Sequence, residues 1–89
     1  MIPISLHVTY RRGQPSAAYI YLSGTPGEKS ARTERIVEDV LIDYAADGHP
    51  IGIEIVSPGH VSLDDINRAF DHLGLPRPEP RELDPLRAA

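Results

Sequence analysis

Two runs of alternating apolar residues, separated by a short turn, constrain the fold of this chain more than any other feature. In residues 40–44 and again in residues 51–56, every second position is aliphatic or aromatic. A period of two places successive side chains on opposite faces of a β-sheet. Between the runs lies Ala45-Ala46-Asp47-Gly48, and an Asp-Gly pair is typical of a tight turn. The pattern predicts an antiparallel hairpin.

The length of the turn decides which side chains share a face. A four-residue loop opposes Tyr44 to His49, and it places the apolar positions of residues 40–44 on the same face as the isoleucines of residues 51–55. An odd loop would put Asp43 among those isoleucines, where its charge would be buried. We therefore expect an even loop. The residues expected on the opposite, outer face are Leu41, Asp43, Gly52, Glu54 and Val56.

Three further strands are expected before this hairpin. Residues 4–10 and 18–22 alternate in the same way, and the turn between them contains Gly13 and Pro15. Residues 31–37 contain a polar run, residues 32–35, before a final Ile36-Val37 pair, so they are expected to form an edge strand.

One helix follows the hairpin, and both of its ends are marked in the sequence. Ser62 and Asp65 have the spacing of a capping box, with aspartate in place of the usual glutamate. Gly74, followed by Leu75, is typical of a helix C-terminus. The apolar stripe expected to face the sheet consists of Leu63, Ile66, Ala69, Phe70 and Leu73.

Length and composition indicate one domain. The chain has 89 residues, 40% hydrophobic, which suits a single small core. We expect an α+β domain over residues 1–75, a five-stranded antiparallel meander with one C-terminal helix packed on one face. Residues 76–89 are rich in proline, so an extended or disordered tail is expected there, and its removal should cost little stability. Because one helix covers only part of a five-stranded sheet, we also expect a homodimer.

The hairpin carries a family resemblance. The stretch Val40-Leu41-Ile42-Asp43-Tyr44, then Asp47-Gly48, then Ile51-Gly52-Ile53-Glu54-Ile55, preceded by residues 18–22, resembles the bacterial domain of unknown function 2283 family. The resemblance implies a small domain without assigned catalytic residues. Members that occur beside small toxin-like genes imply an antitoxin-like or partner-binding role. The acidic turn usual in that family is replaced here by residues 11–15, which contain two arginines.

Charge and residue content argue against several classes of function. Thirteen acidic and nine basic residues give a net charge of −4, which disfavours binding to nucleic acid or to an anionic membrane. The four histidines lack the spacings that bring two imidazoles to one metal, and there is no cysteine. A metal site formed by His60 and Asp64 is the remote alternative. We expect no metal and no cofactor. The first ten residues alternate in polarity, unlike a signal peptide, so a cytoplasmic location is expected.

The expected outer face is the candidate functional surface. We expect Tyr19 and Tyr21 on the same outer face as Leu41, and tyrosine is enriched at protein interfaces. These residues, with Asp43 and Glu54, predict a non-enzymatic module that binds a protein, plausibly a basic one such as a small toxin. The alternative is a small-ligand binder or weak enzyme in which Asp43 and Glu54 divide acid and base roles. No serine, histidine and aspartate can be placed as a hydrolytic triad, so no catalytic residue is assigned.

Overall fold

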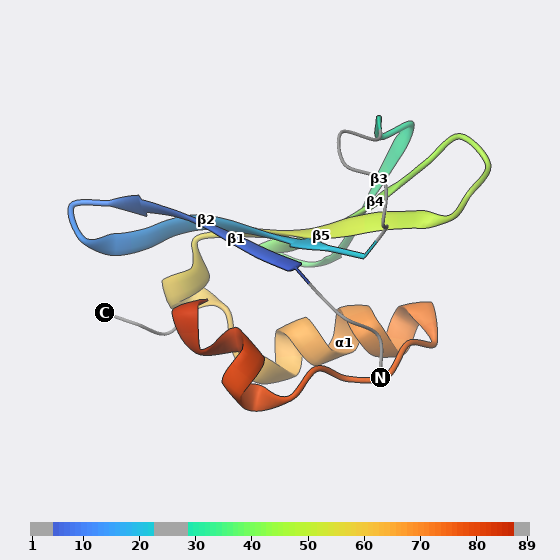
Figure 1. Ribbon diagram of the computed structural model, residues 1–89. Coiled ribbons are helices and arrows are strands. Elements are labelled where there is room, and N and C mark those ends of the chain that lie inside the picture. Colours follow the sequence, from blue (N-terminus) through green and yellow to red (C-terminus); the bar gives the residue numbers. More distant parts are fainter. Residues whose placement is uncertain (1–4, 23–28, 87–89) are drawn as a thin grey trace.

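The computed structural model describes residues 5–22 and 29–86, which form an antiparallel sheet with helical segments on one side (Figure 1). The strands are β1 (Ser5–Arg11), β2 (Gln14–Tyr21), β3 (Arg32–Val37), β4 (Val40–Tyr44) and β5 (Pro50–Val56). They are followed by a 3-10 turn, η1 (Pro58–His60), the helix α1 (Leu63–Leu73) and a second 3-10 segment, η2 (Pro80–Leu86). The predicted α+β class, the five strands and the helix are confirmed.

The order of the strands differs from that of a simple meander. Across the sheet the order is β1-β2-β5-β4-β3, so β5 lies between β2 and β4. The isoleucine-rich β5 thereby gains a neighbour on each side, whereas the polar β3 lies at an edge, as its sequence predicts. A central position suits the most apolar strand, because an edge leaves backbone groups open to water.

The faces of the β4–β5 hairpin are as predicted, but its register is not. Val40, Ile42 and Ile53 are fully buried on the inner face. The loop closes where the amide of Ala45 donates to the carbonyl oxygen of His49, and Ile42 consequently pairs with Ile53. The predicted pairing of Tyr44 with His49 is therefore wrong. The strands are shifted by two residues from Val40 to Asp43, and a shift of two changes the partners without changing the faces.

The helix α1 packs its apolar stripe on this inner face. Ser62 caps it as predicted: its hydroxyl accepts a hydrogen bond from the amide of Asp65, and the Asp65 carboxylate accepts one from the amide of Ser62, both at 3.1 Å. Gly74 ends the helix with a φ of 70°, a left-handed conformation that glycine adopts without strain. Ile66, Ala69 and Phe70 are buried against the strands.

The tail does not behave as predicted. Residues 80–86 form η2 on the same side of the sheet as α1, and Leu83 and Leu86 keep only 1% and 5% of their surface exposed (Figure 1). Both belong to the main core. The prediction that the folded part ends near residue 75 and continues as an extended or disordered arm is therefore wrong for η2. Two leucines three residues apart share one side of a 3-10 helix, and burying them offsets the cost of ordering this segment.

Candidate functional site

The outer face of the sheet is the side that no described segment covers (Figure 1). All five residues predicted for the site lie on it, because their neighbours along each strand are buried on the other side. Tyr21 and Val56 are among the large hydrophobic residues that stay exposed, at 40% and 39%. The predicted site residues are Tyr19, Tyr21, Leu41, Asp43 and Glu54.

The strand register arranges these residues in two neighbouring rows. Glu54 on β5 pairs with Tyr19 on β2 and with Leu41 on β4, so these three form one row across the sheet. In the next row, Gly52 on β5 pairs with Tyr21 and with Asp43. The outer face therefore has aromatic residues on β2 and a carboxylate on each of the next two strands.

Tyr19 leans out of its own row and lies over Gly52. A Cβ atom at Gly52 would lie 2.6 Å from both Cζ and Oη of Tyr19, which is well inside van der Waals contact. The ring can occupy this place only because residue 52 has no side chain. A glycine within an isoleucine-rich strand is the signal in the sequence for such a close approach.

The tyrosine hydroxyl reaches Asp43 on the far side of β5. It donates a hydrogen bond of 2.9 Å to Oδ2 of Asp43, and the Thr33 hydroxyl on β3 donates one of 2.7 Å to Oδ1. Both carboxylate oxygens therefore accept a hydrogen bond, one from β2 across the central strand and one from the neighbouring strand β3. Thr33 is not recognisable as a partner in the sequence, because that pairing depends on the register of the β3 edge strand.

The environment of Tyr19 keeps its hydroxyl protonated. Burial raises the pKa of Tyr19 well above its ordinary value, and the hydrogen bond to Asp43 raises it further. The hydroxyl, which is protonated at neutral pH in any case, therefore remains a hydrogen-bond donor at more alkaline pH. The Tyr21 ring meets the Tyr19 ring edge-on, with centroids 4.8 Å apart, so Tyr19 in turn supports the exposed ring of Tyr21.

The two carboxylates lie on neighbouring strands and make different contacts. Asp43 pairs with Gly52, two residues before Glu54 on β5, so the two acids are diagonal neighbours, and such neighbours lie about 7–8 Å apart. Asp43 is occupied by Tyr19 and Thr33, whereas Glu54 is exposed and has no hydrogen-bond partner among the described residues. This arrangement can hold aromatic rings and present one carboxylate to a partner.

A second polar cluster, which sequence reasoning missed, links the end of α1 to the β3 edge. The Tyr44 hydroxyl donates to Oε1 of Glu34 at 2.7 Å, and Nε2 of His72 lies 3.1 Å from the same oxygen. The Arg32 guanidinium lies 4.1 Å from the centroid of the Tyr44 ring. The Tyr44 hydrogen bond lowers the pKa of Glu34, and His72 lowers it further. The cluster holds the helix against the sheet.

The histidines are not gathered into a metal site within residues 5–22 and 29–86. In these segments no three acidic, histidine or cysteine side chains are placed to hold an ion. His60 lines a polar cavity of about 350 Å³ with Glu38, Asp39 and Asp65, whereas Asp64, its partner in the remote alternative, is not part of that lining.

Fold and surface together define a small α+β domain with an open, tyrosine-bearing sheet face. Residues 16–57, nearly half of the chain, match the family model described as Protein of unknown function (DUF2283). The match covers nearly all of β2 and the whole of β3, β4 and β5, so it includes every predicted site residue. Comparison with curated proteins and with solved structures finds no match. None of the helices in the described segments has the length and apolar character needed to cross a membrane.

Proposed function

We propose that this protein is a non-enzymatic binding module whose outer sheet face holds a basic segment of another protein. The observation that carries the proposal is the fixed position of Tyr19, which is hydrogen-bonded to Asp43 and supports the exposed ring of Tyr21. A rigid aromatic surface loses little conformational entropy on binding. Such surfaces supply many of the residues that dominate binding energy at protein interfaces.

The free carboxylate of Glu54 favours a basic partner. It lies in the same row as Tyr19 and Leu41, between an aromatic ring and an aliphatic side chain. An arginine side chain suits this place, because its guanidinium can pair with the carboxylate and stack on a tyrosine ring. The net charge of −4 would also steer a basic protein towards the chain. A small basic toxin in a bacterial cytoplasm is one partner of this chemistry, and the protein would then act in an antitoxin-like way.

A second copy of the chain is the competing occupant. One helix alone would leave part of the inner face bare, which favours a homodimer, but η2 covers part of that surface. The need for a second copy is therefore weaker on the inner side. On the outer side, Arg35 pairs with Leu41 in the row of Glu54, so a self-complementary contact is possible there.

The proposal is tested by titrating the labelled full chain with an arginine-rich nonapeptide and following amide shifts by NMR. We expect saturable shifts at Tyr19, Tyr21, Leu41 and Glu54, and no binding of a glutamate-rich peptide of equal length. Tyr21→Ala and Glu54→Gln should each weaken binding by about tenfold or more, as truncation of a central interface residue does.

Glu38→Gln is the matched control, since it removes the same charge from an exposed residue in the β3–β4 turn. Equal weakening by Glu38→Gln and Glu54→Gln would mean that net charge, not the outer face, governs binding. Light scattering measures the oligomeric state of the wild type and of Tyr21→Ala. A wild-type dimer that is lost in Tyr21→Ala would mean that a second copy, and not a basic partner, occupies the outer face.

A further inference from the structure

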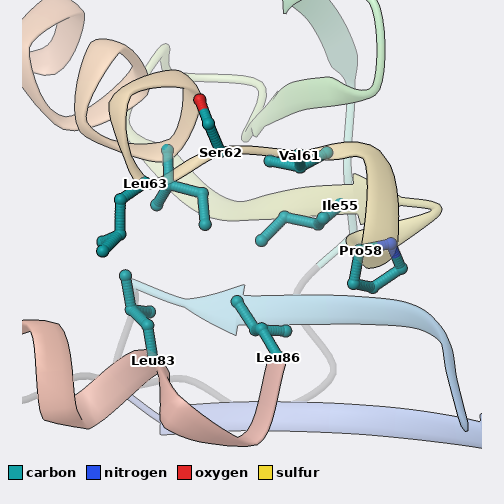
Figure 2. A pocket seen from close by; sticks show the side chains of 8 residues that line it. Ile55, Pro58, Val61, Ser62, Leu63, Leu83 and Leu86 are labelled. Carbon is teal, nitrogen blue, oxygen red and sulfur yellow. The ribbon is translucent and has the colours of Figure 1, made fainter. Parts of the chain in front are cut away.

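A cavity of about 150 Å³ lies between the sheet, the start of α1 and η2 (Figure 2). The side chains of Leu83 and Leu86 extend from η2 towards it, and Ile55 and Leu63 lie across from them (Figure 2). The cavity is on the inner side of the sheet, so it is separate from the tyrosine-bearing face. Its lining consists of Ile55, Pro58, Val61, Ser62, Leu63, Ile66, Leu83 and Leu86.

The side chains that line the cavity are almost entirely apolar. No charged residue contributes to it, and Ser62 is its one polar member. The Ser62 hydroxyl caps α1 by accepting from the amide of Asp65, and it points away from Leu83 and Leu86 (Figure 2). The side chains therefore offer neither a charge nor a directed hydrogen bond to a molecule in the cavity.

The side chains of the lining offer a water molecule few hydrogen bonds. A buried water molecule makes about three hydrogen bonds to polar groups, whereas an enclosed apolar cavity of about 150 Å³ takes up benzene or xenon. The lining side chains have no partner atoms where they face the empty space, and a bound apolar molecule would supply dispersion contacts there. Volume and lining thus select for a neutral, apolar molecule of about the size of a benzene ring.

The wall formed by η2 provides a route of entry. Residues 75–79, which connect α1 to η2, have no regular secondary structure, and η2 is anchored in the core by Leu83 and Leu86. Val61 and Leu63 are half-buried, so the opposite rim is also partly open. A small displacement of η2 would admit a molecule, and contact with the two leucines would then hold η2 in place.

We infer that this cavity is a binding site for one small neutral apolar molecule, an aromatic ring or a short alkyl chain, whose binding fixes η2 on the sheet. The inference does not depend on the proposed protein-binding face. Occupancy of the cavity is thereby linked to the order of the C-terminal segment.

The full chain, labelled at its methyl groups, is titrated with benzene and separately pressurised with xenon. The expected result is saturable shifts at the methyl groups of Ile55, Ile66, Leu83 and Leu86, with slower hydrogen exchange of the η2 amides. Shifts that fail to saturate, or that spread evenly over the outer-face residues, would overturn the inference. So would shifts of the same methyl groups on concentrating the protein without benzene, because a second copy would then be the occupant.

Val61→Phe tests the cavity by filling it, and Val56→Phe is the matched control, the same change on the exposed outer face. Benzene affinity should fall by about tenfold or more in Val61→Phe and stay unchanged in Val56→Phe. Leu63→Phe fills the space from α1 and serves as the second variant should Val61→Phe fail to fold. Unchanged affinity in a folded filled variant would contradict the inference, and the wild-type titration stands without either variant.

Discussion

The hydroxyl of Tyr19 on β2 donates its hydrogen bond to the carboxylate of Asp43 on β4, so one side chain spans the central strand β5. The span is possible because Gly52, which lies beneath the Tyr19 ring, has no side chain to displace it. Two strands that do not pair with each other are thereby tied together on the outer face. The candidate surface is built on this contact.

Gly52→Ala should destabilise the protein by about 1–3 kcal/mol, because the new methyl group would displace the Tyr19 ring. The free energy of unfolding in urea measures the effect. In a Tyr19→Ala background the same change should cost much less, since the obstacle is gone and alanine suits a strand better than glycine. An equal cost in both backgrounds would contradict the close approach.

Tyr19→Phe should cost about 1 kcal/mol, the usual net value of one hydrogen bond. The ring and its packing remain, so only the bond to Asp43 is lost. The cost should disappear in an Asp43→Ala background, where the acceptor is absent, and a double-mutant cycle measures this coupling. Full additivity of the two changes would show that the hydroxyl contributes nothing through Asp43.

Leu83→Ala should destabilise the fold by about 2–5 kcal/mol, as expected for a large side chain removed from a core. Arg81→Ala in the same segment is exposed and should change stability by less than about 0.5 kcal/mol. Chemical unfolding of the two variants provides the comparison. Similar values for both would restore the view of this segment as a loose tail.

Acid unfolding should depend on Tyr44 through Glu34. The pKa of Glu34 is lowered in the folded chain, first by the Tyr44 hydrogen bond, so its stabilising effect is present above the ordinary value of 4.5 and is lost as the pH falls through the lowered pKa. Tyr44→Phe should move the titration midpoint of Glu34 upwards, as measured by carboxyl carbon NMR. Asp71, whose pKa is lowered by Arg77, is the internal reference and should not move. A Glu34 midpoint unaffected by Tyr44→Phe would exclude the hydrogen bond as the cause.

The sequence predicted which side chains face inward, because burial of alternate residues is read directly from the pattern. Ile42 and Ile53 are buried and Glu54 is exposed, as alternation requires. The same pattern is insensitive to a shift of two residues, and so the β4–β5 register was predicted wrongly. Strand order also escaped prediction, since pairing of β2 with β5 is a long-range contact that no local signal encodes.

The prediction for residues 76–89 was wrong for η2 because their high proline content outweighed the weaker signal of two spaced leucines. Leu83 and Leu86 are three residues apart, which is the repeat of a 3-10 helix, but two apolar residues among prolines and charges resemble a solvated arm. At the candidate site, the alternation of residues along each strand is enough to predict that the five residues lie on the outer face. Their contacts, above all the Tyr19 ring over Gly52, required the register.

The family segment contains most of the sheet but none of its cover. Residues 16–57 end before α1 and η2, the two elements that shield Ile20, Ile42 and Ile53 from water. Taken alone, that stretch would expose a broad apolar surface that α1 and η2 cover in this chain. In this chain, therefore, segments outside the family match complete the interior that lies beneath the candidate surface.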